Sequence, residues 1–430
     1  MVSHASTRHL ILALGTVLQI CTSAALNLGT TVALADTAVL NSATANNKAT
    51  EVFDEVWRQV RDGFYDPNLH GVDWQAIGDE YRPRYASAKS DAERSAVINA
   101  MLDKLGASHT RHYTKDQPAY FQLVEIFAYP LRDGIKRIFG SSKPTYPGIG
   151  IFTKELEGRT FVSGVLAGLA GSKAGLLVGD EIVSVDDKPF EAIGSFRGKV
   201  GQPVILEVRR HKGGPTRRLL VVPEVIEPGE AFKTAMTQGA SIIERNGRRI
   251  GHVPIFSYAG GEYQETLIDL LSSGKLKDAD AVIWDLRDGW GGARPGYLDV
   301  FVPQGAAMTL TERSGETERV NFRWRKPVAL VINQGSRSGK EVLAHAFKEY
   351  NIGSVVGETT AGALLAGRAF LLGDDSLLIL AVNDVKVNEV RLEGVGVSPT
   401  VEVPFDIRYA AGRDPQLETA IELLSGGQDG

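Results

Sequence analysis

Cysteine is almost absent from this sequence of 430 residues, since Cys21 is the only one. A chain with one cysteine cannot close an internal disulfide, and it has no thiolate cluster to hold zinc. A basic excess is also missing, because 47 Lys and Arg stand against 52 Asp and Glu, a formal charge of −5. Nucleic acid is therefore not an expected partner, because no basic footprint is present.

The sequence also lacks an unbroken apolar run of the ~20 residues that a membrane helix needs. The nearest approach is at the N-terminus, where Arg8 precedes a short apolar stretch that ends at Cys21. We interpret residues 1–35 as a cleaved secretory signal and residues 36–49 as a flexible lead. Cleavage would leave a secreted or periplasmic chain with no thiol, a formal charge of −6 and no stable membrane span.

Helical periodicity dominates residues 50–140, which we predict to be a helical domain. Its first apolar stripe recurs at three- and four-residue spacing through Val52, Phe53, Val56, Trp57, Val60 and Phe64. Further helices are expected to start at Asp73 and at Ser90, and the run ends near Gly106. A last run over 120–139 could pack as core or act as a lid.

The character changes over residues 147–227, where short β-rich pieces alternate with Gly, Asp and Lys turns. Gly148-Ile149-Gly150-Ile151 opens this module, and residues 172–185 read as a short helix, a turn and a strand. A Gly-x-Gly turn can leave backbone N–H groups free for a carboxylate, and an edge strand can pair with an extended peptide.

Together these two stretches resemble a PDZ domain. The resemblance implies that Gly148, Ile149, Gly150 and Ile151 bind the C-terminal tail of a protein or peptide.

Strand and helix patterns alternate over residues 228–410, which predicts an α/β domain with a partly parallel sheet. Residues 411–430 form a C-terminal segment. The whole chain is therefore expected to be a multidomain α/β protein, consistent with the usual ~150 residues per domain.

Two motifs in the α/β domain suggest chemistry. A buried-type strand runs into a glycine loop at Gly291 and Gly292, where N–H groups could stabilise an oxyanion. A second buried strand ends in a small-residue turn, so that Ser338 would stand at the start of a helix. Such a serine is most often a helix cap, but its position opposite the glycine loop makes it a candidate nucleophile.

The order of these segments, with Asn-x-Gly-Ser-x-Ser-x-x-Glu ending at Glu341, resembles the carboxyl-terminal processing (tail-specific) serine peptidases. The resemblance implies a crotonase-like α/β core. It places the nucleophile at Ser338 rather than Ser336, and the oxyanion donors at Gly339 and the Gly291-Gly292 loop.

One position departs from that family. Ala363 stands where the processing peptidases usually carry the lysine that acts as general base, and Lys340 is too close to Ser338 to replace it. Ser108-His109 instead resembles the Ser-His stretch of the tricorn-core branch of the superfamily. This implies His109 as general base, although a structural role for this histidine stays open.

In the same branch Ser108 would support the histidine, and Glu393 is the best match for a late glutamate that orients or polarises the site. No metal, nucleotide or organic cofactor is implied. The interpretation is a serine endopeptidase that binds protein or peptide tails and cleaves through an acyl-enzyme. The alternatives are a catalytically inactive peptide-binding scaffold, which Ala363 favours, and a carrier of hydrophobic ligands. The oligomeric state is not specified by these motifs.

Overall fold

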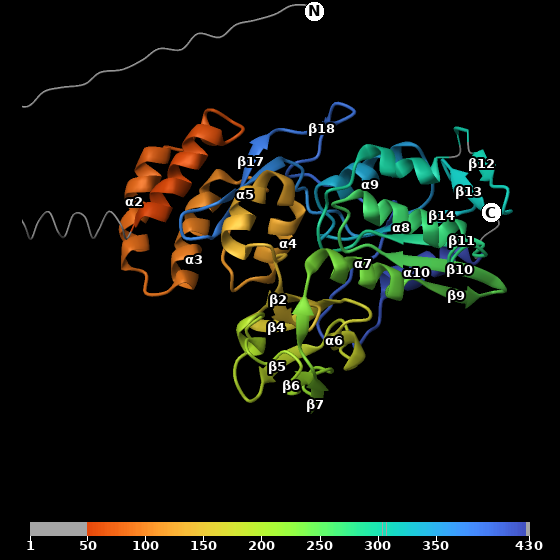
Figure 1. The fold of residues 1–430 in the computed structure, drawn as a ribbon, viewed down its shortest axis with the longest axis horizontal. Coiled ribbons are helices and arrows are strands. Elements are labelled where there is room, and N and C mark those ends of the chain that lie inside the picture. The colour runs from red at the N-terminus through yellow and green to blue at the C-terminus, as the bar shows by residue number, and fades with distance from the viewer. Residues whose placement is uncertain (1–49, 303, 307, 427–430) are drawn as a thin grey trace, which may run out of the picture. The chain divides into compact units, whose positions relative to one another are not determined.

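The computed structural model describes residues 50–302, 304–306 and 308–426. The predicted signal and flexible lead, residues 1–35 and 36–49, lie outside the described residues. The described chain is a mixed α/β protein, as the alternating patterns predicted (Figure 1).

Helices fill the N-terminal part at the expected places. They cover residues 50–63, η1 (Leu69–Gly71), α2 (Trp74–Ser87), α3 (Asp91–Leu102) and η2 (Asp103–Leu105). Asp73 and Ser90 cap α2 and α3, since each side chain accepts a hydrogen bond from an N–H of the first turn. In the apolar stripe of the first helix Phe53, Val56 and Val60 are fully inaccessible to solvent, whereas Val52 and Trp57 are partly buried.

The core of these helices is completed from the distant C-terminal half of the chain. Leu378, Leu380 and Ala381 of β17 (Leu377–Asn383) pack into the same cluster as Phe53. The strand β17 also pairs with β16 (Ala366–Leu371) and with β1 (Arg111–Tyr113), antiparallel to both. Figure 1 shows β17, in blue, beside the orange helices. This pairing holds the segment just before β1, where Ser108 and His109 lie.

The run over 120–139 forms two helices rather than one. The first, α4 (Pro118–Ile126), ends at Phe127, whose φ of −99° and ψ of 24° are not helical, and α5 (Ala128–Phe139) follows. Tyr120, Leu123 and Val124 of α4 are buried in the main core, whereas α5 buries only Leu131. The first half of the run therefore packs as core.

The β module has a sheet and a core of its own. Five antiparallel strands follow one another in sheet order β3-β4-β5-β6-β7, and β3 is an edge strand. Their bounds are Ile151–Leu156, Arg159–Val165, Glu181–Val185, Val204–Arg209 and Thr216–Val221, with α6 (Ala170–Lys173) and η3 (Gly194–Phe196) between them. The strand β2 (Tyr146–Gly148) pairs with β8 (Glu224–Ile226) where the chain enters and leaves. The predicted strands are confirmed, and the PDZ identity of the module stays a prediction.

The largest sheet has six strands in the order β20-β15-β14-β11-β10-β9, and every neighbouring pair is parallel except β9 with β10. Their bounds are β9 Ser241–Arg245, β10 Arg248–Pro254, β11 Ala281–Asp285, β14 Val328–Ile332, β15 Val355–Gly357 and β20 Val401–Glu402. Every residue of β11 and β14 is buried, which explains why these strands are apolar in sequence apart from Asp285 at the end of β11.

Helices cover both faces of this sheet. One core cluster contains residues of α7 (Pro228–Gly239), α8 (Gly261–Ser272) and α9 (Gly339–Glu349), whereas α10 (Pro415–Leu424) packs in a separate cluster on alternate residues of the strands. The remaining elements are η4 (Pro295–Phe301) and the hairpins β12–β13 (Met308–Thr311, Thr317–Val320) and β18–β19 (Lys386–Val387, Val390–Arg391). The expectation of a partly parallel sheet is confirmed, and its likeness to a crotonase core stays a prediction.

Before α10 the chain returns to the β module. The Tyr409 N–H donates to the Gly179 carbonyl over 3.0 Å, and the Tyr409 hydroxyl donates to Glu181 over 2.8 Å. The Tyr409 ring also meets the edge of Phe161, with 5.2 Å between centroids. The C-terminal part of the core therefore fastens the module to the sheet.

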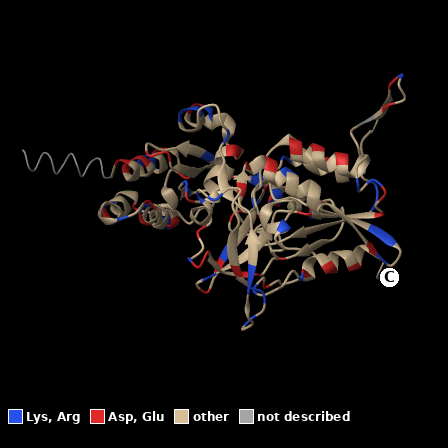
Figure 2. Ribbon diagram, turned by 60° about the horizontal axis from the view of Figure 1, so that its bottom comes forward, with Lys and Arg blue, Asp and Glu red and all other residues tan. Residues whose placement is uncertain are grey.

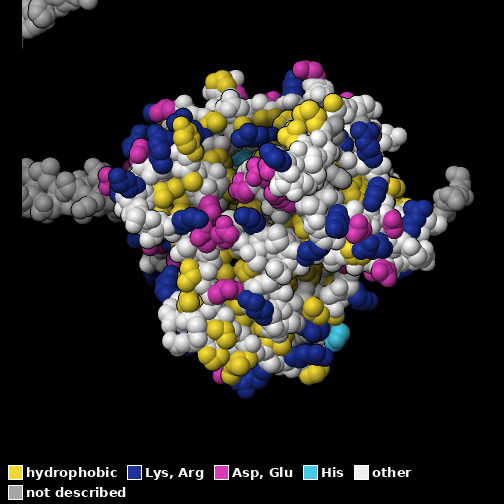
Figure 3. All heavy atoms as spheres, turned by 45° about the vertical axis from the view of Figure 1, so that its right-hand side comes forward, with side chains coloured by type: hydrophobic (Ala, Val, Ile, Leu, Met, Phe, Trp, Pro, Cys, Tyr) yellow, Lys and Arg dark blue, Asp and Glu magenta, His cyan; other side chains and the backbone are white. Residues whose placement is uncertain are grey.

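Charges of both signs are interspersed along the elements in Figure 2, and the face in Figure 3 shows hydrophobic side chains in small separate groups among polar ones. Within the part of the chain that the structure describes, no helix is long and apolar enough to cross a membrane.

Candidate active site

Ser338 lies at the turn between β14 and α9, with a φ of 56° and a ψ of −129°. Non-glycine residues rarely adopt such a backbone, and strain of this kind is concentrated at functional sites. The alternative serine, Ser336, is fully buried; its hydroxyl donates to the Leu286 carbonyl and accepts from the Asn333 N–H. Ser338, in contrast, lines a cavity of about 400 Å³.

Glu341 holds the turn in place. Its carboxylate accepts hydrogen bonds from the N–H groups of Ser338, Gly362 and Ala363 at 3.1, 2.7 and 2.8 Å, and from the Thr360 hydroxyl at 2.6 Å. Burial raises the pKa of Glu341, and these hydrogen bonds oppose the rise. The glutamate that marks the sequence motif is therefore a positioning residue, which sequence reasoning used only as a landmark.

The glycine loop lies directly against Ser338. A Cβ placed on Gly291 would lie 2.6 Å from the Ser338 Cβ and 2.9 Å from the Gly339 nitrogen, so only glycine fits there. Among the described residues, no hydrogen-bond acceptor is found for the N–H groups of Gly291, Gly292 or Gly339. Three backbone donors beside a serine can stabilise the oxyanion of a tetrahedral intermediate.

Ser108, His109 and Glu393 form a hydrogen-bonded chain. The Ser108 hydroxyl lies 3.0 Å from His109 Nδ1 and donates to Glu393 Oε2 over 2.8 Å. The Ser108 N–H donates to Glu393 Oε1 over 2.9 Å, and the Leu364 N–H donates to Oε2 over 2.7 Å. Glu393 thus orients the serine that contacts the imidazole and ties it to the loop after Ala363.

One cavity of about 400 Å³ brings these groups together. Its lining includes Ser108, His109, Gly291, Gly292 and Ser338. No hydrogen bond joins the His109 ring to the Ser338 hydroxyl in the described structure, a geometry common in enzymes without bound substrate. Burial lowers the pKa of His109 to about 4; the Glu393 carboxylate opposes this shift and the Arg337 guanidinium adds to it. The imidazole is therefore neutral at pH 7, as a general base must be.

The usual lysine position is also at this cavity. Ala363 lines it, and the Ala363 carbonyl accepts a hydrogen bond from the Ser338 N–H over 2.9 Å. Lys340 does not line the cavity, because its Nζ is buried and donates to the carbonyls of Ile255 and Asp288, each over 2.6 Å. Burial lowers the pKa of Lys340 to about 7. Among the described residues that line this cavity there is no lysine and one histidine, His109.

The predicted tail-binding residues lie in a separate groove of about 190 Å³. Gly148, Ile149, Gly150 and Ile151 line it, and so does Trp290, which also lines the cavity of Ser338. Sequence reasoning did not single out Trp290 as a site residue. Its place immediately before Gly291 was the available signal.

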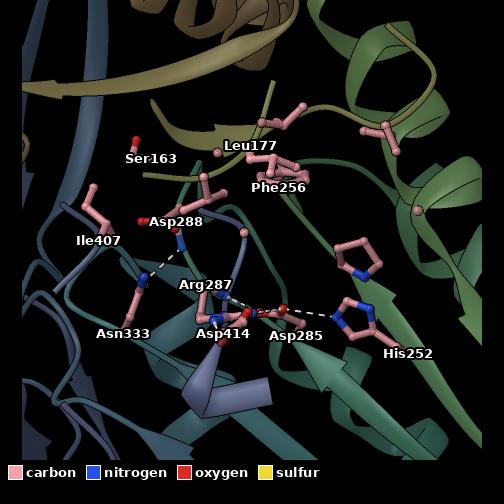
Figure 4. Close-up of a pocket in the computed structure, with 18 of the residues that line it drawn as sticks. Ser163, Leu177, His252, Phe256, Asp285, Arg287, Asp288, Asn333, Ile407 and Asp414 are labelled. Atoms are coloured by element: carbon pink, nitrogen blue, oxygen red, sulfur yellow. Dashed lines mark hydrogen bonds and ion pairs between the residues drawn. The ribbon is translucent and has the colours of Figure 1, made fainter. Parts of the chain in front are cut away.

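A further cavity, of about 350 Å³, lies between the β module and the sheet (Figure 4). Burial alone would raise the pKa of Asp285, but the charge of Arg287 and hydrogen bonds from His252 and Arg287 hold this pKa far below its ordinary value. Arg287 also binds Asp414, which caps α10. Asp285, at the end of β11, and Arg287 therefore hold parts of the fold together. Among the residues described, no group of three or more His, Cys, Asp or Glu is arranged to hold a metal ion.

Comparison with known proteins gives two family matches. Residues 249–403 match peptidase family S41, and residues 45–103 match the tricorn protease C1 domain. The S41 match contains Ser338, Ala363, Glu393 and the Gly291-Gly292 loop.

Individual relatives agree with these matches. A tricorn protease homologue of Streptomyces coelicolor is 27% identical over 395 residues, which span 87% of this chain and 32% of that protein. The carboxyl-terminal-processing protease of Synechocystis sp. is 23% identical over 410 residues, 90% of this chain and 89% of that protein. The crystal structure of the tricorn protease shares the fold, with a TM-score of 0.52 at 18% identity over 88% of this chain and 37% of that one.

The chain spans about a third of the length of the tricorn-type relatives that it matches. These relatives are named as proteases or as protease homologues. None of them supports the inactive-scaffold alternative.

Proposed function

We propose that this chain, whose residues 249–403 match peptidase family S41, hydrolyses peptide bonds through an acyl-enzyme on Ser338 with His109 as the general base. The observation that carries the proposal is that one cavity is lined by the strained Ser338, the neutral His109 and a glycine loop with free N–H groups. Substrates are expected to be proteins or peptides.

In the proposed reaction His109 Nε2 takes the proton of the Ser338 hydroxyl while the oxygen attacks the scissile carbonyl. The N–H groups of Gly291, Gly292 and Gly339 stabilise the oxyanion of the tetrahedral intermediate. His109 then protonates the leaving amine, and the same residue activates the water that releases the acyl group. Glu393 holds Ser108 and so keeps the imidazole oriented.

Covalent labelling with a fluorophosphonate tests the nucleophile directly. We expect the purified protein to gain one adduct by intact mass, and we expect Ser338→Ala to gain none while keeping its melting temperature. Ser336→Ala is the matched control for the neighbouring serine and should still be labelled. An adduct that persists in Ser338→Ala would move the nucleophile elsewhere, and no adduct in the wild type would favour the inactive scaffold.

We further propose that the β module is a PDZ-like domain that binds substrate tails by strand addition to β3, and that the protein acts outside the cytoplasm. The edge position of β3 and the groove at residues 148–151 support tail binding. Ile151→Asp should weaken discrimination between tailed and untailed peptides. Leu220→Asp adds the same charge at a position of β7 that is 67% exposed, and should not. Equal kcat/KM for both peptides in the wild type would remove this role.

A further inference from the structure

Arg337 directly precedes Ser338 and lines the same cavity. Its guanidinium carbon lies over the Trp290 ring, 5.9 Å from the centroid. The Trp290 indole N–H donates to Gln122 Oε1 over 2.8 Å, which holds the ring in place. The arginine is therefore supported on a fixed aromatic surface next to the candidate nucleophile.

The guanidinium of Arg337 has no ionic partner in the described chain. None of the ion pairs found there includes Arg337, and its one hydrogen bond is a long one, 3.4 Å from Nε to the Gly335 carbonyl. The remaining N–H donors of the fork are free. A planar fork of free donors matches the two oxygens of a carboxylate.

The charges of the side chains that line the cavity also favour a carboxylate ligand. Two arginines line it, Arg337 and Arg111, against one carboxylate, that of Asp103. Neither arginine forms an ion pair with Asp103 or with any other described residue. The Arg337 charge adds to the lowering of the pKa of His109 and opposes the rise that burial causes in the pKa of Tyr113, so this positive charge acts at the centre of the site.

We propose that Arg337 is a specificity-determining residue that binds a carboxylate of the substrate beside the scissile bond. The proposal rests on the proposed peptidase function. The carboxylate could belong to the C-terminus of a short tail or to an Asp or Glu side chain, and both present the same two oxygens to the fork. A bound carboxylate would also neutralise a charge that disfavours protonated His109, which is the form that develops during acylation.

The test measures kcat/KM for three peptides that share one sequence. The first ends in a free carboxylate, the second in an amide, and the third is amidated but carries Glu in place of one Gln near the scissile bond. The quantity compared is the ratio of each carboxylate peptide to the neutral amide. All measurements are made in the Ile151→Asp background as well, so that carboxylate binding in the tail groove does not contribute.

We expect the wild type to prefer at least one carboxylate peptide by about 10- to 100-fold, the usual strength of a hydrogen-bonded charge contact. Arg337→Gln should bring that ratio close to one in both backgrounds. Arg368→Gln removes the same charge from β16 without altering the cavity lining, and it should leave the ratio unchanged. The peptide that loses its preference identifies the source of the carboxylate.

A ratio that Arg337→Gln leaves intact overturns the proposal, as does a wild type without carboxylate preference in the Ile151→Asp background. Arg337→Lys keeps the charge but loses the planar fork, so the ratio of kcat/KM values should lie between those of the wild type and Arg337→Gln. This variant replaces Arg337→Gln in the test if Arg337→Gln does not fold. Fluorophosphonate labelling of wild-type Ser338 separates the two hypotheses. An enzyme that is labelled but shows no carboxylate preference contradicts only this inference. An enzyme that is neither labelled nor active contradicts the proposed function as well.

Discussion

Two cavities of similar size differ in how their charged groups are partnered. The cavity of about 350 Å³ in Figure 4 contains a closed network, in which Asp285 binds His252 and Arg287, and Arg287 also binds Asp414. The cavity of about 400 Å³ at Ser338 contains Arg337 with no ionic partner in the described chain and a glycine loop with free N–H groups.

This difference indicates that the charged groups of the first cavity contribute to stability, whereas those of the second are suited to chemistry. Buried charges that bind one another hold elements together, and removing one partner leaves the other without compensation. N–H donors without an acceptor beside a strained serine do not stabilise the folded chain. Their role is therefore to bind a molecule that enters the cavity. Asp285 and Arg287 belong to the first kind of group and the Gly291-Gly292 loop to the second, although they lie only a few residues apart in the sequence.

The largest effect is expected when substitutions of two histidines, His109 and His112, are compared. His109→Gln should lower kcat by about 10²- to 10⁴-fold, the usual contribution of a general base, with little change in melting temperature. The matched variant is His112→Gln. His112 lies 2.8 Å from both the Ser95 and Ser376 hydroxyls, and burial lowers its pKa to about 4 as well. This variant should destabilise the fold by about 1–3 kcal/mol and keep Ser338 reactive. The reverse pattern would make His109 structural.

The second effect tests the closed network. Arg287→Met leaves His252 as the only side-chain partner of Asp285 among the described residues, and the side chains of Asp285 and Arg287 are only 7% and 13% exposed. We expect the free energy of unfolding to fall by about 3–5 kcal/mol, measured by urea denaturation, while labelling of Ser338 persists below the melting temperature. Arg218→Met changes an exposed arginine of β7 and should cost little. Unchanged stability in Arg287→Met would show that the two cavities do not differ as described.

A smaller effect is expected from Glu393→Gln. The substitution removes the charge and one of the two acceptors that hold Ser108 and the Leu364 N–H. The value of kcat/KM should fall about 10- to 100-fold, whereas Glu389→Gln, an exposed neighbour, should have no effect. Full activity in Glu393→Gln would remove the glutamate from the proposed machinery. Loss of activity with an equal loss of stability would make it a fastening group like Asp285.

The smallest effect is a shift in pH dependence. Burial lowers the pKa of His109 to about 4, so the base stays neutral and active as the pH falls from 7, and activity is lost only as the pH falls through about 4. An unburied histidine would lose activity near its ordinary pKa of ~6.5. The pH at which activity is lost in acid is measured from the pH profile of kcat/KM for an amidated, uncharged peptide. Arg337→Gln should move it upward, because Arg337 adds to the lowering.

The contribution of His109 to the free energy of unfolding should also fall as the pH falls. The unfolded chain binds a proton at His109 before the folded chain does, so this histidine's contribution to stability falls as the pH drops from ~6.5 towards 4. Asp285 behaves differently, because its folded pKa is held far below the ordinary value and its contribution is lost only in stronger acid. An acid limb of activity that coincides with unfolding would not report on His109, so denaturation is followed over the same pH range.

Local features could be predicted from the sequence. The buried strands before Gly291 and Ser338, the helix after Ser338 and the five strands of the β module follow from side-chain periodicity and turn residues within a few positions of one another. The candidate nucleophile and its glycine loop were found for the same reason, because each is a strand end followed by a short turn. The mixed α/β fold and the peptidase family follow from the order of these segments.

Only the tertiary structure decided the rest. Ser108 and Glu393 are 285 residues apart in the sequence, and they meet because β1 pairs with β17 and the helices share a core with that strand. The two helices of 118–139, the return of Tyr409 to the module and the free fork of Arg337 likewise depend on which surfaces pack together. Periodicity records which side of an element is buried but not against what, so contacts between distant residues are determined by the packing of the whole chain.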